Sequence, residues 1–283
     1  MTNRTPSLPR RTFLRGIGTA ASLGAFSPLL VPVAATPQAS SAAAAGTGPL
    51  IANVICGGLA NDHDIDLARL RLLDGLYAMG GVRTEVWRDY SNADVIAKGD
   101  LLVSYSSMIA ADAEQQRTLR RYIEGGGRWF AIHASNYARE PQQIPEVLGS
   151  RFITHPPFGP FKVTVTKPDD PLLTGLGVTS FDVIDELYVM DLAKDIDVLL
   201  HARWGGTGVL NITVPEGDQP LMYRRRVGKG GVLYLALGHG NRRLGAPAPG
   251  RPSVPDRHDS WDMPVYKDLI RRGLEWAAGR RPL

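Results

Sequence analysis

The chain has 283 residues, of which 43% are hydrophobic and 21% are charged, a composition typical of a soluble globular protein. The length allows one large domain or two small ones. The formal net charge of +4 comes from Arg4, Arg10, Arg11 and Arg15, because without them the 32 basic residues become 28 and balance the 28 acidic ones. The basic charge therefore gives no reason to expect a nucleic acid as a partner, and we expect none.

The amino-terminal segment has the pattern of an export signal. The pair Arg10-Arg11 is followed by Phe13-Leu14, by a weakly apolar stretch over residues 16–35 and by small-residue sites such as Val33-Ala34-Ala35. The stretch contains glycines and prolines and is too weakly apolar for a stable membrane span, so we expect none in the mature chain. We predict that residues 1–48 are a twin-arginine signal and flexible linker, read by the twin-arginine translocation machinery. The mature protein is then periplasmic or extracellular.

From Leu50 the chain alternates between short apolar runs and amphipathic segments. Strands are expected at 51–56, 82–87, 101–104 and 128–132, and helices at 65–76 and 113–123. Strands that alternate with helices of this length indicate an α/β fold with a doubly wound, mostly parallel sheet and helices on both faces. Cys56, the only cysteine, lies in the first expected strand. It is interpreted as a small buried hydrophobe rather than a nucleophile.

The second half indicates added antiparallel strands. Residues 161–166 alternate between apolar and polar, as in a strand with one solvated face, and 198–202 is a further strand. Residues 221–225 are expected to pair with 231–237 through a glycine turn. The segment Leu244–Pro255 is predicted to be a surface loop, and 263–278 a closing amphipathic helix. With no composition break after residue 50, residues 49–283 are predicted to form a single domain.

The histidines are the main candidates for chemistry. Five of the six follow strand ends or lie in loops: His63, His133, His155, His239 and His258. Because parallel strands end at one edge of a sheet, we expect His63, His133 and His239 to meet there. Near neutral pH a histidine can act as a base, an acid or a metal ligand. For His133 the alternative is a buried ring bonded to a backbone carbonyl, and His201, within a strand, is interpreted as structural.

Several motifs resemble one known family. In chain order they are Gly125-Gly126-Gly127-Arg128-Trp129-Phe130-Ala131-Ile132-His133-Ala134-Ser135, Leu148-Gly149-Ser150-Arg151-Phe152, His155-Pro156, Asp185-Glu186-Leu187-Tyr188, Gly228-Lys229-Gly230-Gly231-Val232, Leu237-Gly238-His239-Gly240 and Arg272-Gly273-Leu274-Glu275-Trp276-Ala277. The sequence resembles the ThuA-like family, named for trehalose utilisation, from Ile51 to Gly279. The resemblance implies a flavodoxin-like fold similar to class I glutamine amidotransferases. Their nucleophilic cysteine is replaced here by His133, so acyl transfer by a thiolate is not expected.

The resemblance also implies carbohydrate metabolism, in particular the cleavage of glycosides or disaccharides oxidised at carbon 3. A ketone at that carbon acidifies the proton on carbon 2, so a base and an acid suffice to release the group on carbon 1. We assign His133 or Glu186 as base and His155 as acid or electrophile. The residues assigned to substrate binding are His63, Asp185, Tyr188, His239 and Asn136. Asp185 could also orient a histidine ring.

Two other uses of the same residues remain open. Histidines with a carboxylate also suit a divalent metal ion such as Zn²⁺ or Mn²⁺, which would make the protein a metal-dependent hydrolase. The short ligand spacing of many zinc sites is absent, so a metal site depends on convergence in the fold. The chain could instead be a sugar-binding or accessory protein without turnover.

Overall fold

The computed structural model describes residues 48–58, 63–137, 143–242 and 256–283, which belong to a compact unit beginning at Gly46. The predicted export signal and the predicted Leu244–Pro255 loop lie outside the described residues. In the described part of the chain, no helix is both long and apolar enough to cross a membrane.

Five parallel strands form one half of a nine-stranded sheet. They are β1 (Leu50–Gly58), β2 (Val82–Trp87), β3 (Leu101–Ser107), β4 (Arg128–Ile132) and β11 (Gly230–Leu235). Their order in space is β2-β1-β3-β4-β11, which is the order of a flavodoxin-like sheet. Every residue of β3 and β11 is buried, as expected for continuous apolar runs covered on both faces. The predicted parallel half of the fold is confirmed.

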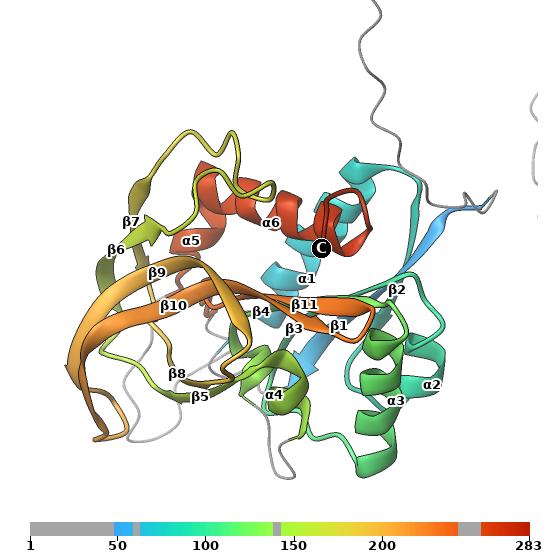
Figure 1. Cartoon of the computed structure of the whole chain (residues 1–283), viewed down its shortest axis with the longest axis horizontal. Coiled ribbons are helices and arrows are strands. Elements are labelled where there is room, and N and C mark those ends of the chain that lie inside the picture. The colour runs from blue at the N-terminus through green and yellow to red at the C-terminus, as the bar shows by residue number, and fades with distance from the viewer. Residues whose placement is uncertain (1–47, 59–62, 138–142, 243–255) are drawn as a thin grey trace, which may run out of the picture. The chain divides into compact units, whose positions relative to one another are not determined.

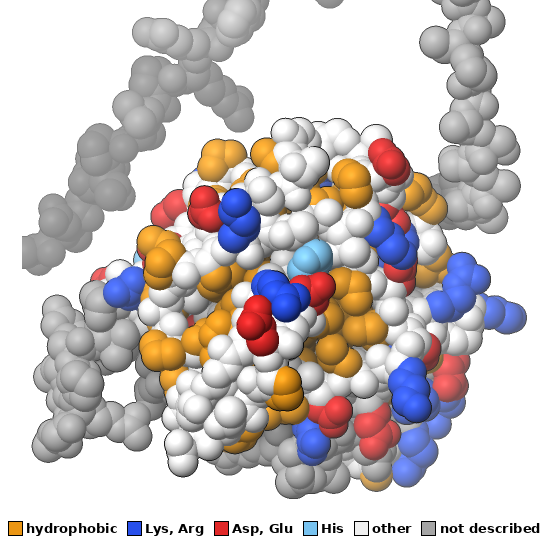
Figure 2. All heavy atoms as spheres, turned by 60° about the vertical axis from the view of Figure 1, so that its left-hand side comes forward, with side chains coloured by type: hydrophobic (Ala, Val, Ile, Leu, Met, Phe, Trp, Pro, Cys, Tyr) orange, Lys and Arg blue, Asp and Glu red, His pale blue; other side chains and the backbone are white. Residues whose placement is uncertain are grey.

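Four antiparallel strands extend this sheet beyond β11. They are β10 (Thr213–Val227), β9 (Ile196–Thr207), β6 (Gly159–Val165) and β7 (Ser180–Asp185), in that order. The β10–β11 hairpin turns at Gly228, as the sequence predicts. Figure 2 shows this side of the molecule, where basic and acidic side chains lie beside one another among hydrophobic ones. Pairs such as Arg203 with Glu216 are examples on β9 and β10.

Helices cover both faces of the parallel half. In Figure 1, α1 (Ile65–Met79) and α6 (Pro264–Ala277) lie on one face, while α2 (Ala93–Ile96) and α3 (Ala113–Glu124) lie on the other. The amino end of α3 is fixed by a capping box between Asp112 and Gln115. Both faces of the central strands are therefore removed from water.

Four further short elements complete the fold and, like α2 and β7, were not predicted. The strands β5 (Ser150–Thr154) and β8 (Val189–Leu192) form a separate antiparallel pair. The helix α4 (Gln143–Leu148) precedes β5, and α5 (Asp259–Asp262) precedes α6. Strand β7 ends at Asp185. These elements bring the loops after β5 and β7 to the carboxyl edge of the parallel strands.

Candidate functional site

Four histidines and one glutamate meet at the carboxyl edge of the parallel strands. His63 lies between β1 and α1, His133 directly follows β4, and His239 follows β11. His155 directly follows β5, and Glu186 directly follows β7. The parallel strands therefore supply three rings, as expected from their common edge, and the antiparallel strands supply the other two groups.

The distances within this group are short. The ring centres of His63, His133 and His239 lie 5.1, 5.2 and 5.4 Å apart. Glu186 Oε2 lies 3.2 Å from His239 Nδ1 and 3.6 Å from His133 Nε2, and Glu186 Oε1 lies 3.4 Å from His155 Nε2. One potential metal-ligating atom from each of His63, His133, Glu186 and His239 lies within 4.8 Å of the others. We call these four residues the His₃Glu cluster.

His133 is held in one orientation at the start of a 3₁₀ turn. Its backbone has a φ of +50°, a left-handed conformation that costs a non-glycine residue about 1–3 kcal/mol. Tyr234 Oη donates to the carbonyl of His133 at 2.6 Å. The ring Nδ1–H donates to the Ala236 carbonyl at 2.7 Å, because a carbonyl can only accept. The neutral ring therefore carries its lone pair on Nε2, which faces the cluster.

Asp185 fixes the loop that carries His239. Its Oδ2 accepts the backbone N–H of Gly238 at 2.8 Å, and its Oδ1 accepts those of His239 at 3.0 Å and Glu186 at 2.7 Å. Ser260 Oγ also donates to it. Burial raises the pKa of Asp185 to about 6, although these hydrogen bonds act in the opposite direction. Asp185 thus positions His239 through hydrogen bonds to the backbone. The sequence-based hypothesis had Asp185 orient a histidine ring directly, and the structure differs on this point.

Burial keeps two of the rings neutral. It lowers the pKa of His63 to about 3 and that of His133 well below its usual value. Both ring nitrogens of His63 are buried and have no hydrogen-bond partner. Burial would raise the pKa of Glu186, but the hydrogen bond and charge of His239, together with His133 and His155, lower it to about 2. The Glu186 carboxylate therefore shares the cluster with the neutral rings of His63 and His133.

A cavity of about 340 Å³ opens over the His₃Glu cluster, a size within the range of small-molecule sites. His63, His239, Glu186 and His155 line it, whereas His133, which is fully buried, does not. Its other lining residues are Tyr137, Phe152, Phe158, Tyr188, Val209, Leu210, Asn241 and Arg257. His155 Nδ1 bonds the Pro156 carbonyl at 2.7 Å, which turns Nε2 towards Glu186.

The aromatic residues of the cavity form a connected wall. The ring of Phe152 lies 4.5 Å from that of Tyr188 and 5.0 Å from that of Tyr137, and Arg257 lies over Phe158. Tyr188 also places Oη 3.3 Å from His133 Nε2. The sequence singled out Tyr188 but not Phe152, Phe158 or Arg257. The signal in the sequence that could have identified the two phenylalanines is that they lie on either side of His155.

Two predicted substrate contacts do not reach this cavity. Asn136 is fully buried and donates from Nδ2 to Ser150 Oγ at 2.8 Å, so it ties the turn after β4 to β5. Asp185 is fully buried beneath the His239 loop. Both assignments are corrected to structural roles, because neither side chain lines the cavity and each is hydrogen-bonded within the protein. His201 bonds Thr166 Oγ1 at 2.8 Å and does not line the cavity, consistent with a structural residue.

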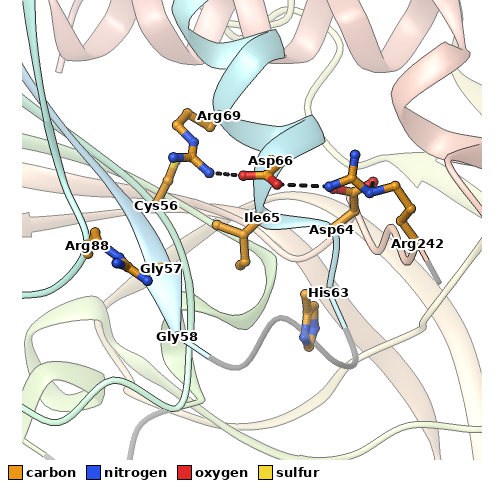
Figure 3. A pocket seen from close by; sticks show the side chains of 10 residues that line it. All are labelled: Cys56, Gly57, Gly58, His63, Asp64, Ile65, Asp66, Arg69, Arg88 and Arg242. Carbon is orange, nitrogen blue, oxygen red and sulfur yellow. Dashed lines mark hydrogen bonds and ion pairs between the residues drawn. The ribbon is translucent and has the colours of Figure 1, made fainter. Parts of the chain in front are cut away.

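A second cavity, of about 300 Å³, lies on another side of His63. Figure 3 shows that Asp66 lies between Arg69 and Arg242 and pairs with both. Cys56 also lines this cavity, and burial raises the pKa of its thiol to about 12. A protonated, buried thiol agrees with the interpretation of Cys56 as a hydrophobe and not a nucleophile.

Comparison with known proteins supports the resemblance seen in the sequence. The ThuA family model, described as trehalose utilisation, matches residues 54–249. A ThuA-like protein from Bacteroides uniformis is 18% identical with a TM-score of 0.63, covering 86% of this chain and 97% of its own. One from Parabacteroides merdae is 17% identical with a TM-score of 0.62, covering 81% and 90%. These two likenesses show the fold, and no curated protein matches the sequence.

Proposed function

Because the chain belongs to the ThuA family of trehalose utilisation, we propose that it is a carbohydrate-active enzyme that cleaves glycosides or disaccharides oxidised at carbon 3 of a sugar ring. The observation that carries this proposal is the meeting of His155, Glu186 and the histidine rings at one cavity with an aromatic wall. Aromatic rings suit the apolar faces of sugars, and the ionisable groups suit proton transfer.

The chemistry needs a proton taken from carbon 2, a proton given to the glycosidic oxygen on carbon 1, and a partner for the ketone oxygen. Atoms on neighbouring carbons require acid and base groups that are close together. His155 Nε2 and Glu186 Oε1 are 3.4 Å apart and both line the cavity, so we assign proton transfer to this pair. Water added to the resulting double bond completes net hydrolysis.

The exposure of the two candidates favours Glu186 over His133 as the base. His133 is fully buried, does not line the cavity and presents its lone pair to Glu186 and Tyr188. It cannot touch a substrate in this cavity without rearrangement. Glu186 and His155 are the groups with direct access, with 14% and 16% of their side chains exposed.

The test is a screen of glucosides and disaccharides and their 3-keto derivatives, with product analysis and thermal shift on the same protein. We expect product only from the keto derivatives. His155→Gln should lower kcat by about 10²–10⁴-fold, which is the usual effect of losing a general acid or base. His201→Gln, a histidine outside the cavity, is the matched control and should leave turnover unchanged.

Two results would contradict the proposal. Keto sugars that stabilise the protein without being converted would indicate the alternative, a sugar-binding or accessory protein. Turnover that survives His155→Gln would remove the assigned proton carrier.

The twin-arginine motif supports a further part of the proposal, that the enzyme works outside the cytoplasm. Fractionation of cells that express the full chain, with Arg10-Arg11 replaced by two lysines as a control, tests this.

A further inference from the structure

We infer that the His₃Glu cluster is a binding site for a divalent transition-metal ion, with Zn²⁺ as the first candidate, held by His63, His133, His239 and Glu186. This inference deepens the proposed function, because it concerns the same cavity. It rests on four features of the described residues: ring spacing, nitrogen–oxygen distances, lone-pair direction and an unpartnered buried ring.

The spacing of the three rings matches a tetrahedral ion. Zn–N bonds of about 2.0–2.1 Å at tetrahedral angles place two ligand nitrogens about 3.4 Å apart. With about 1.1 Å from nitrogen to ring centre, the centres of two zinc-bound imidazoles lie about 5.2 Å apart. The three observed separations are 5.1, 5.2 and 5.4 Å. Packed rings elsewhere in the protein, such as Tyr223 and Tyr234 at 5.2 Å, reach similar separations, so the spacing supports an ion only together with the positions of the ligand atoms.

The carboxylate occupies the fourth corner. The same tetrahedral estimate gives about 3.3–3.4 Å between a ligand oxygen and a ligand nitrogen. Glu186 Oε2 lies 3.2 Å from His239 Nδ1 and 3.6 Å from His133 Nε2. The second distance is too long for a hydrogen bond, so hydrogen bonding alone does not explain why Oε2 points between the two rings.

The lone pair of His133 Nε2 points into the cluster. His133 uses its Nδ1–H on the Ala236 carbonyl, so its Nε2 lone pair faces the carboxylate oxygen. The Tyr188 hydroxyl, at 3.3 Å, can donate to this lone pair, whereas a cation between Nε2 and Glu186 Oε2 would satisfy both electron-rich atoms at once. A backbone carbonyl that receives the second N–H of a ligand histidine is also the usual support of a metal site.

His63 supplies the strongest local observation. Its side chain is 6% exposed, and neither ring nitrogen has a hydrogen-bond partner. Leaving a buried polar atom unpartnered costs about 1–3 kcal/mol, so such atoms in a folded protein call for an explanation. A metal–nitrogen bond at one ring nitrogen provides it. One ring nitrogen of His63 lies within 4.8 Å of the ligand atoms of His133, His239 and Glu186, which suits the remaining ligand position.

The metal site assigns different roles to the two oxygens of Glu186. Oε2 is the ligand atom, while Oε1 lies 3.4 Å from His155 Nε2 and holds that ring at the cavity wall. His155 is then the proton carrier of the proposed reaction. A bound ion that accepts a further ligand from the cavity side would polarise the ketone oxygen of a bound substrate.

The first experiment is elemental analysis of the full chain, purified without chelator and without a histidine tag. We expect about one equivalent of zinc or another divalent transition metal per chain. Removing it with a chelator should lower the thermal midpoint, and adding back Zn²⁺ should restore it, because an ion that binds only the folded state stabilises it. These readouts do not depend on activity.

Matched variants locate the site. Glu186→Gln and His63→Ala should each lower the affinity for Zn²⁺ by at least tenfold, measured by competition with a chromophoric chelator. Glu186→Gln nearly conserves shape, so it serves if His63→Ala fails to fold. His155→Gln and His201→Gln should both keep full metal content. Spectra of the Co²⁺-substituted protein should change with Glu186→Gln and stay the same with His201→Gln.

The outcomes separate this inference from the proposed function. A metal-free protein that neither Zn²⁺, Mn²⁺ nor Co²⁺ stabilises would overturn the metal site and leave proton transfer by His155 open to its own test. Metal content unchanged in both Glu186→Gln and His63→Ala would place the ion elsewhere and overturn it as well. A metal-bound protein with no turnover of keto sugars would support the site and contradict the proposed function.

Discussion

The replacement of Asp185 by asparagine tests how the fold positions His239. Asp185 accepts three backbone N–H groups and the Ser260 hydroxyl through two oxygens. Asparagine has one accepting oxygen. In the orientation that keeps more hydrogen bonds, the amide oxygen accepts from the N–H groups of Glu186 and His239, and the amide NH₂ group donates to Ser260. The N–H of Gly238 then faces another donor and stays unpaired in a buried place.

The expected loss follows from this count of acceptors. One unsatisfied buried N–H costs about 1–3 kcal/mol, so Asp185→Asn should lower the free energy of unfolding by about 2 kcal/mol in urea titrations. Because the His239 loop is displaced, the affinity for Zn²⁺ should also fall by about 10–100-fold, as for other residues that support a metal ligand.

The same strand offers a matched control. Asp182 is an exposed residue of β7, so Asp182→Asn removes the same charge without touching the loop. It should change stability by less than about 0.5 kcal/mol. If Asp185→Asn were as stable as Asp182→Asn and bound metal as well as the parent chain, Asp185 would not be the support of the His239 loop.

Three further predictions concern backbone, pH and metal. Gly238 has a φ of +118°, and a Cβ there would lie 2.2 Å from the buried Tyr266 Oη, so Gly238→Ala should lower the thermal midpoint far more than Gly177→Ala, where φ is +80° and the space is open. The pKa of His63 is about 3 in the folded protein and about 6.5 in the unfolded chain. Between these pH values the unfolded state binds more protons, so the stability present above pH 6.5 is lost as the pH falls. In metal-free protein this amounts to about 2 kcal/mol between pH 6.5 and 5, and urea titrations should show a shallower pH dependence in His63→Gln. Free Zn²⁺ at about 100 times its Kd should raise the free energy of unfolding by about 2.7 kcal/mol, measured in the same titrations.

The parallel half of the fold could be predicted because its signals are local. Strands β2 and β4 begin and end where the sequence places them. For β4 the signal is a buried apolar run after a glycine turn, whereas β2 is a partly exposed edge strand that begins after a glycine pair. The meeting of His63, His133 and His239 followed from one rule of topology, that parallel strands end at a common edge. No distance information was needed for these expectations.

The remaining parts depend on contacts between distant segments. Strands β5 and β8 are short and pair with each other across about forty residues, so neither carries a strong pattern of its own. Burial decided the roles of Asp185 and Asn136, and the sequence alone gives no measure of burial for a polar residue at a strand end. The aromatic wall likewise joins residues of separate segments, such as Phe152 and Tyr188.

The direct test of the account is a crystal of the full chain, grown without chelator in the presence of Zn²⁺, with diffraction collected on both sides of the zinc absorption edge. We predict an anomalous peak among His63 and His133, Glu186 Oε2 and His239 Nδ1, with bonds of about 2.0–2.2 Å. Diffraction without a peak among these residues, or with zinc bound only elsewhere on the surface, would contradict the account.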